Sequence, residues 1–111
     1  MTVPLKWVPL AREVDVPEGK AALVKHQRTE ILIFHTGGGW TAYDNTCPHA
    51  GAPIYPEHFD GECVTCVYHG LRFRASDGAC PDCPGWELEA YPVKAEAGEV
   101  LVGFQDFGSD Q

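Results

Sequence analysis

Two short segments of the chain each hold one cysteine and one histidine close together. In CPHAGAP, Cys47 and His49 are separated by one residue, and in CVYHG, Cys66 and His69 are separated by two. Sixteen residues lie between the two pairs. Glycine and other small residues near each pair are typical of turns. Two turns that each offer a thiolate and an imidazole can converge on one metal centre, and the fold has to allow that convergence.

This mixture of ligands suits a 2Fe–2S cluster with two inequivalent irons. Cys47 and Cys66 would bind the inner iron, and His49 and His69 would bind the outer one. Because neutral nitrogens replace two anionic sulfurs, the centre is less negative and its reduced form is stabilised. The reduction potential then rises from about −400 mV in all-cysteine clusters to about −150 mV or higher. These four side chains are the predicted cofactor-binding residues and metal ligands.

A second cysteine pattern competes for Cys66. Cys63 and Cys66, followed after thirteen residues by Cys80 and Cys83, have a spacing just below that of a zinc ribbon. A structural zinc site would leave both cysteine–histidine pairs unexplained, so it is the less favoured alternative. In the cluster interpretation, Cys63 is expected to be a small buried strand residue. Cys80 and Cys83 are expected to be free thiols without a catalytic role, with a reversible disulfide or a second metal as alternatives.

The rest of the chain has the pattern of short strands between turns. Nine prolines and twelve glycines are spread along it, and no segment of helical length has a 3.6-residue period. The sequence therefore predicts an all-β sandwich or small barrel with a loop-rich insertion from about 45 to 70. The expected strands are 21–26, 30–36, 40–44, 61–66, 71–75 and 98–104.

Composition narrows the class of protein. A length of 111 residues fits one domain. The net charge of −8 disfavours nucleic-acid binding, which needs clustered lysine and arginine. No apolar run approaches the roughly 18 residues of a membrane span, and the N-terminus lacks the pattern of a secretion signal. We therefore expect a cytoplasmic protein, in which an odd number of cysteines favours metal binding over a disulfide framework.

At the paired motifs, the chain resembles the Rieske iron–sulfur proteins. The similarity covers CPHAG, the sixteen-residue gap, CVYHG and the following LRF. The later YPV, before a last strand with an EVLV pattern, is also similar to the small Rieske ferredoxins of bacterial ring-hydroxylating oxygenases. The resemblance implies a single Rieske domain over residues 1–111. Its fold is an antiparallel β-sandwich base with a small inserted cluster-binding lobe at about 45–85.

Residues around the ligands fit this resemblance with one departure. Gly51 and Gly70 would let the backbone approach the cluster and donate N–H groups to its sulfides. Val67 stands where the family commonly has proline after the second cysteine. We expect the change to cost little, because the ligands and Gly70 remain.

The resemblance also implies a low reduction potential within the family. Rieske proteins of respiratory complexes have an extra disulfide between the ligand loops and hydroxyl groups that donate to the cluster sulfurs. The positions that match the disulfide are Ala52 and Tyr68, and those that match the hydroxyls are Leu71 and Phe73. Without these hydrogen bonds the added electron is less stabilised. We predict a potential nearer about −150 mV than about +300 mV.

The function implied by the resemblance is electron transfer without catalysis. The expected role is a 2Fe–2S ferredoxin that carries single electrons from a flavin-dependent reductase to the terminal oxygenase of an aromatic dioxygenase or monooxygenase system. No catalytic residue is predicted, since 111 residues leave no room for the mononuclear iron domain of an oxygenase. Both partners are expected to bind transiently to a monomer. The alternative is the small Rieske subunit of another reductase, such as a nitrite reductase, bound permanently to a large subunit.

Overall fold

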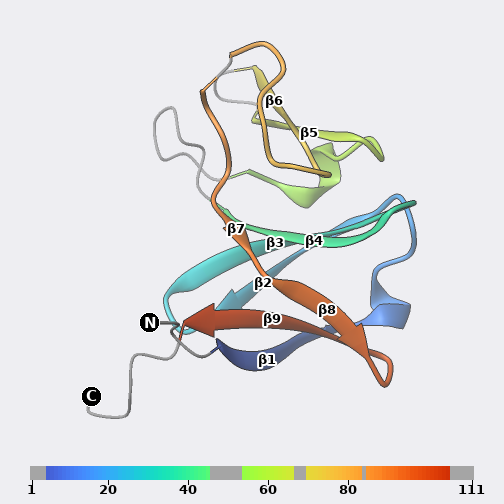
Figure 1. Ribbon diagram of the computed structural model, residues 1–111. Helices are drawn as coiled ribbons and strands as arrows, with labels where there is room; N and C mark the ends of the chain where they lie inside the picture. The colour runs from blue at the N-terminus through green and yellow to red at the C-terminus, as the bar shows by residue number, and fades with distance from the viewer. Residues whose placement is uncertain (1–4, 46–53, 67–69, 84, 106–111) are drawn as a thin grey trace.

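The structure is a computed structural model that describes residues 5–45, 54–66, 70–83 and 85–105 (Figure 1). Within these ranges the only helical segments are two 3-10 turns, η1 (Glu13–Asp15) and η2 (Pro56–His58). The predicted all-β class is confirmed. The strands are β1 (Leu5–Arg12), β2 (Ala21–His26), β3 (Thr29–Thr36), β4 (Gly39–Asp44), β5 (Cys63–Cys66), β6 (Leu71–Arg74), β7 (Ala90–Tyr91), β8 (Val93–Glu96) and β9 (Glu99–Gln105).

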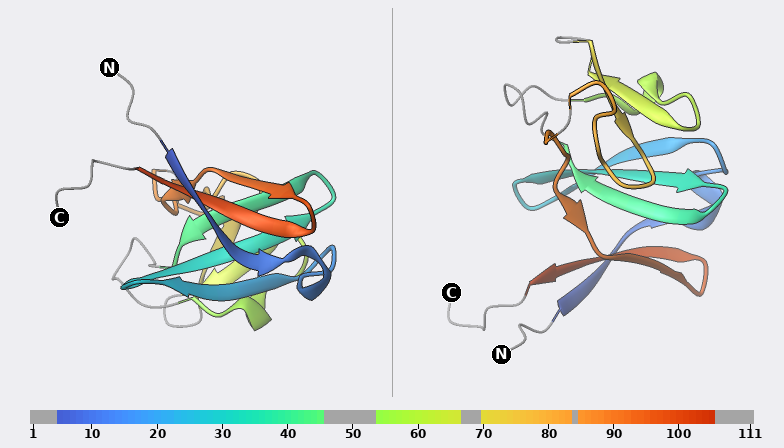
Figure 2. Two further views of the ribbon diagram at one scale, coloured as in Figure 1. Left: turned by 90° about the horizontal axis from the view of Figure 1, so that it is seen from below. Right: turned by 45° about the horizontal axis from the view of Figure 1, so that its top comes forward.

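Two antiparallel sheets form the base of the molecule. The order β1-β9-β8 makes the first sheet and β2-β3-β4-β7 makes the second, and the two lie one above the other (Figures 1 and 2). Ile31 and Ile33 of β3 pack between the sheets against Val100 and Val102 of β9, and all four side chains are fully buried. This sandwich confirms the predicted antiparallel base.

A third layer covers the other face of the second sheet. This hairpin layer consists of residues 54–66, 70–83 and 85–88, and β5 and β6 pair at its centre. Because side chains alternate along a strand, Leu32 and Phe34 point away from the base core and pack with Val64 and Phe73 of the hairpin layer. β3 is thus buried on both faces, which explains why the apolar run ILIF shows little alternation.

The turn after β6 fixes the hairpin layer to the second sheet. The carbonyl oxygen of Ala75 accepts hydrogen bonds from Thr41 Oγ1 at 2.7 Å and from the Tyr43 hydroxyl at 2.8 Å. Gly78 lies directly against Tyr43, since a β-carbon at this glycine would be 2.7 Å from the ring atom Cε1. The N–H of Leu88 then donates to the Gly78 carbonyl at 2.9 Å. The contacts of Ala75 and Gly78 with β4 hold the two layers together, and the Leu88 bond closes the turn within the hairpin layer.

The six predicted strands are all present, with small differences at their ends. The largest difference is in the predicted strand 61–66, which begins at Cys63. Asp60 Oδ1 accepts the N–H groups of both Glu62 and Cys63 at 2.8 Å, and the residues before the strand are therefore held in a turn. The same bonds lower the pKa of the Asp60 carboxyl below its ordinary value. The described residues contain no helix that is long and apolar enough to cross a membrane.

Candidate metal centre

One of the four predicted ligands lies in the described part of the chain. Cys66 ends β5, has no exposed surface and belongs to the core between the second sheet and the hairpin layer. The N–H of Gly70 donates to the Cys66 carbonyl at 2.7 Å, and Gly70 has a φ of +70°, which favours glycine. Cys47, His49 and His69 lie outside the described residues, so their assignment as ligands stays a prediction.

The ends of the first ligand segment meet the same core. Residues 46–53 include Cys47 and lie between Asn45 and Ile54. Ile54 is fully buried in the cluster of side chains that also contains Cys66. Ile54, which follows the first segment, and Cys66, the first residue of the second pair, therefore pack in one core, as a centre shared by the two segments requires.

A third segment packs against this core. Cys80 is buried, and Cys83 and Trp86 lie against the same cluster of side chains. The backbone turns tightly here, because the N–H of Cys83 donates to the Cys80 carbonyl at 3.3 Å and the N–H of Trp86 donates to the Cys83 carbonyl at 3.2 Å. Burial, and then a hydrogen bond with the Cys80 thiol, raise the pKa of the Cys83 thiol. These two cysteine side chains are thus adjacent, with Cys80 in the core and Cys83 packed against it.

The zinc-ribbon interpretation is wrong. Cys66 is fully buried, whereas Cys63 is half-buried and pairs in register with Arg74 on the opposite face of the hairpin. An odd spacing along a strand places the two thiols on opposite faces. All four cysteines of the proposed ribbon are described, and no three cysteine, histidine or acidic residues in the described ranges are grouped to hold a metal. The expectation that Cys63 is buried is also wrong in degree.

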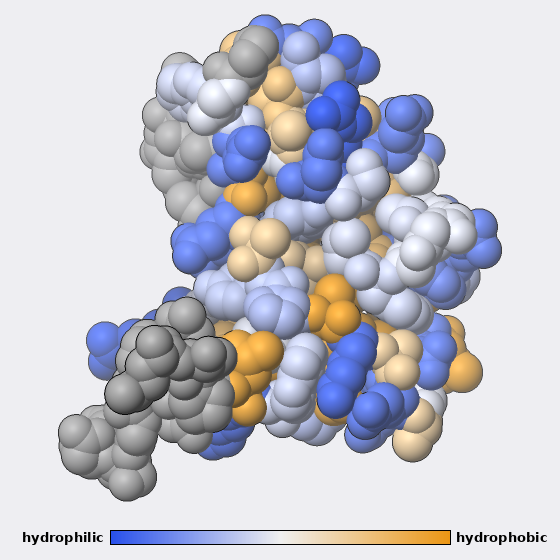
Figure 3. All heavy atoms as spheres, viewed as in Figure 1, coloured by the Kyte–Doolittle hydropathy of each residue, from blue (hydrophilic) through white to orange (hydrophobic). Residues whose placement is uncertain are grey.

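The outward face of the hairpin carries charged pairs. Arg72 binds Asp82 through two contacts of 3.2 Å, and Arg74 binds Asp77 at 3.0 and 3.2 Å. Hydrophilic residues are numerous on the upper part of the molecule in Figure 3, where β5 and β6 lie. The Arg72–Asp82 pair connects β6 to the turn that holds Cys80 and Cys83.

Histidines outside the two motifs have other structural roles. The ring of His35 stacks on Trp40 with centroids 4.0 Å apart, and its Nδ1 donates to the Val16 carbonyl at 2.8 Å. His26 stacks on Phe104 at 4.5 Å. Their contacts explain these histidines without a metal.

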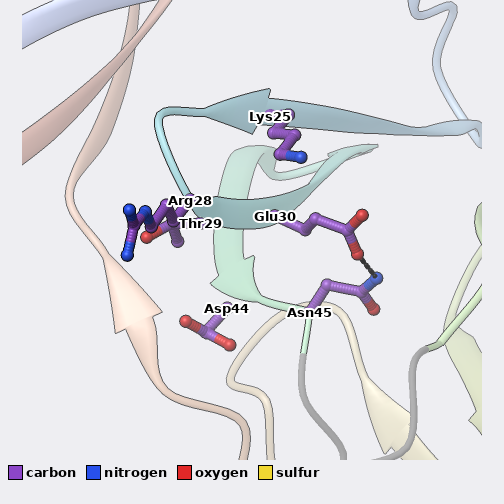
Figure 4. Close-up of a pocket in the computed structure, with 6 residues that line it drawn as sticks. All are labelled: Lys25, Arg28, Thr29, Glu30, Asp44 and Asn45. Carbon is purple, nitrogen blue, oxygen red and sulfur yellow. Dashed lines mark hydrogen bonds between the residues drawn. The ribbon is translucent and has the colours of Figure 1, made fainter.

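A polar pocket lies beside the base of the first ligand segment (Figure 4). Its volume is about 270 Å³. Two cationic and two carboxylate side chains line it together with two neutral ones, so its formal charges balance. The lining residues are Lys25, Arg28, Thr29, Glu30, Asp44 and Asn45. Sequence analysis did not single out Asn45, which connects this pocket to Ile54.

Comparison with known proteins identifies the family. Residues 6–92 match the Rieske [2Fe-2S] domain. The chain is 32% identical over 92 residues to the biphenyl dioxygenase ferredoxin subunit of Pseudomonas sp. strain KKS102, which covers 81% of this chain and 84% of that protein. It is 35% identical over 95 residues to the toluene-4-sulfonate monooxygenase iron–sulfur subunit TsaM1 of Comamonas testosteroni. That match covers 78% of this chain but spans only 27% of the longer TsaM1.

Solved structures share the fold. The Sphingomonas yanoikuyae B1 ferredoxin superposes with a TM-score of 0.73 at 25% identity, over 87% of this chain and 97% of that one. A Mycobacterium tuberculosis protein assigned as the small subunit of an NADH-dependent nitrite reductase gives 0.76 at 20% identity, over 93% and 98%. The buried thiol of Cys66, at the end of a strand in a dry core, fits an inner-iron ligand. The chain belongs to the Rieske family and carries the 2Fe–2S cluster of that family.

Proposed function

We propose that this protein is a ferredoxin that passes single electrons from a flavin-dependent reductase to a terminal oxygenase acting on aromatic compounds. Its similarity to the biphenyl dioxygenase ferredoxin subunit extends over 84% of that relative. The structural observation that carries the proposal is the packing of Cys66 and Ile54 in one core. This packing supports the proposal, because Ile54 and Cys66 are the described residues next to or within the two ligand segments, and both belong to the same core.

The four motif residues would hold the cluster, within a lobe formed by residues 45–85. Cys47 and Cys66 would bind the inner iron, and His49 and His69 the outer one. When bound, the cluster supplies reversible one-electron chemistry. The chain excludes water from the inner side, since the Cys66 thiol lies in an apolar core. The Cys66 thiol would bind the inner iron as a thiolate, the form of cysteine that ligates metals.

Transfer to partners is proposed to take place through brief encounters of a cytoplasmic monomer. Electron-transfer complexes usually bury less than about 1,200 Å² in total, which permits rapid exchange between a reductase and an oxygenase. No catalytic side chain is proposed, because both partners would supply the reactions at their own centres.

The test is a reconstituted electron-transfer chain. The purified protein, with iron and acid-labile sulfide quantified, is mixed with NADH, a flavin-dependent reductase, a Rieske-type terminal oxygenase and its aromatic substrate. We expect product formation that depends on this protein in substoichiometric amounts. The variant Cys66→Ser should lose the cluster and the activity together. A loaded protein that the reductase reduces but that never supports oxygenase turnover would contradict the proposal.

The alternative role as a nitrite reductase small subunit is supported only by fold. A TM-score of 0.76 at 20% identity indicates shared architecture and leaves the partner open. A permanent subunit would co-purify with a large partner when expressed in its own cells. A ferredoxin would elute alone, at the size of one chain.

A further inference from the structure

Asn45 is an unusual residue in the core. Its amide side chain is buried, with 6% of the residue's surface exposed. It follows β4 directly and precedes the segment 46–53, which contains Cys47 and His49. A buried amide needs partners for its polar atoms, because an unpaired polar group in a core is costly.

Within the described residues, three hydrogen bonds connect Asn45 to Glu30 and Ile54. Its N–H donates to the Glu30 carbonyl at 2.9 Å. Its Nδ2 donates to the Glu30 carboxylate oxygen Oε1 at 3.2 Å, the contact dashed in Figure 4. Its Oδ1 accepts the N–H of Ile54 at 2.8 Å. Asn45 therefore joins β3, the end of β4 and the residue that follows the first ligand segment.

The two ends of this link belong to buried parts of the protein. Glu30 belongs to β3, whose next four residues are fully buried between the layers. Ile54 is itself fully buried, so its N–H has to be paired inside the protein. The Asn45 side chain accepts that N–H. The bond therefore joins the two residues that flank the eight-residue segment 46–53.

We propose that Asn45 is a positioning residue that fixes, through Glu30 and Ile54, where the first ligand segment enters the cluster site. The proposal rests on the assignment of Cys47 and His49 as ligands. Asn45 acts through the backbone at both ends of the segment and does not itself bind the cluster. Groups outside the ligand shell commonly change metal affinity by about 10–100-fold when they are removed.

The chemistry of the link is specific to an amide. One atom of the side chain has to accept from Ile54 and the other has to donate to the Glu30 carboxylate. An aspartate keeps the acceptor but sets a second carboxylate against Glu30. If Glu30 is changed to glutamine at the same time, the new amide can donate to that aspartate. The hydrogen bond between the two side chains is then restored, with residue 30 as the donor and residue 45 as the acceptor.

The experiment compares four cluster-loaded full-length variants with the native chain. They are Asn45→Ala, Asn45→Asp, Glu30→Gln and the double variant Asn45→Asp with Glu30→Gln. The readouts are the g-values of the reduced cluster by electron paramagnetic resonance, the rate at which a chelator bleaches the visible absorbance, and thermal unfolding. Asn45→Ala and Asn45→Asp should shift the g-values and lose the cluster about tenfold faster or more. Glu30→Gln and the double variant should stay within about twofold of the native rate.

A control separates positioning from general stability. Thr41→Val removes a hydrogen bond between the second sheet and Ala75 and leaves the three hydrogen bonds of Asn45 unchanged. It should lower the melting temperature without shifting the g-values. Native g-values and bleaching rates in folded Asn45→Ala would overturn the proposal, and so would an equal shift in Thr41→Val.

The remaining variants keep the proposal falsifiable. Should Asn45→Ala not fold, Asn45→Asp and the double variant decide, because both keep the acceptor for Ile54. Identical g-values in these two would overturn the inference.

A separate variant, Cys47→Ser, tests the ligand assignment. If Cys47→Ser keeps a native cluster, the ligand assignment is wrong and the proposal for Asn45 is wrong with it. If Cys47→Ser loses the cluster but Asn45→Ala behaves like the native chain, only the positioning role of Asn45 is wrong.

Discussion

At the scale of single residues, the contact between Gly78 and Tyr43 decides how closely the hairpin layer approaches the second sheet. Gly78 has a φ of +75°, and a β-carbon there would be 2.7 Å from the Tyr43 ring. Gly98 has a similar φ of +83°, but a β-carbon there would meet nothing within 4 Å. The two glycines therefore separate the cost of backbone strain from the cost of a clash.

We predict that Gly78→Ala destabilises the protein more than Gly98→Ala. Gly98→Ala should cost about 1–2 kcal/mol, the penalty for an L-residue in the left-handed region. Gly78→Ala should cost about 1–3 kcal/mol more, because overpacking is added. Urea unfolding of both cluster-loaded variants measures the difference. Equal losses would show that Tyr43 moves aside without cost.

Tyr91 provides a prediction about alkaline pH. Burial, and then the neighbouring Asp44 carboxylate, raise the pKa of the Tyr91 hydroxyl to about 12, and that hydroxyl donates to Asp44 Oδ2 at 3.3 Å. The unfolded tyrosine ionises near about 10. Between these values the unfolded chain binds fewer protons at this site, so stability falls as pH rises from about 10 to about 12.

The tyrosinate absorbance at alkaline pH tests this assignment. Tyr91→Phe should remove one ionisation near pH 12, and Asp44→Asn should move it to lower pH. The stability of Tyr91→Phe should depend less on pH across this range than that of the native chain. An unchanged titration curve in Tyr91→Phe would show that the Tyr91 hydroxyl does not ionise within the pH range measured.

Leu71 offers a test of the predicted low potential. It is half-buried against the core that contains Cys66, and it has no hydroxyl for the cluster sulfurs. The native potential should be near about −150 mV. If Leu71→Ser adds a hydrogen bond of about 1 kcal/mol to the reduced cluster, the potential should rise by about 40 mV. Spectroscopic redox titration measures both, with Leu71→Ala as the control for lost bulk. A native potential well above zero would contradict the prediction.

At the scale of elements, the turn that holds Cys80 and Cys83 tests the role of the extra thiols. We predict that the double variant Cys80→Ser with Cys83→Ser keeps its cluster and its electron transfer. It should lose roughly 1–3 kcal/mol of stability, because a hydroxyl replaces a thiol in the buried position of Cys80. Visible absorbance and reduction by dithionite or a reductase measure the two properties. Loss of transfer with an intact cluster would assign the thiols a role.

Strands with a strong apolar pattern were predictable from sequence, and those interrupted by proline were not. The run ILIF and the final EVLV segment both form strands near their predicted bounds. β1 contains Pro9, which disfavours a strand interior, and the pairing of β1 with β9 shifts register between Pro9 and Ala11. Pro92 likewise separates β7 from β8. Tertiary pairing with β4 and β9 stabilises these strands, and no local pattern reports it.

The sequence predicts ligands for the candidate site but gives little sign of the residues that support them. The spacing of the motifs predicts Cys66 as a ligand, and its burial is compatible with that role. Asn45 gave no comparable signal, because its importance depends on contacts with Glu30 and Ile54, at 15 and 9 residues' distance along the chain. A short polar residue beside a motif is common in loops. The burial of Asn45, which only the structure shows, distinguishes it from such residues.

At the scale of the whole molecule, the net charge of −8 governs encounters with small redox partners. An anionic oxidant such as ferricyanide is repelled, and a cationic one such as hexaamminecobalt(III) is attracted. Salt screens both interactions, with a Debye length of about 10 Å at 0.1 M. We predict that added salt speeds oxidation of the reduced protein by ferricyanide and slows oxidation by hexaamminecobalt(III). Stopped-flow absorbance measures the two rates, and parallel salt effects would show that the charge is remote from the route of electron transfer.

The position of β3 has a consequence for how the protein is assembled and degraded. Ile31 and Ile33 belong to one core and Leu32 and Phe34 to the other, so the two cores share one strand and we expect them to unfold together. A chain truncated to the sandwich alone would expose the apolar face of the second sheet that includes Leu32 and Phe34. We expect such a chain to aggregate. Disruption of the hairpin layer would expose the face of β3 that it covers, and we expect protein that has lost its cluster to be degraded by proteases faster than the loaded protein.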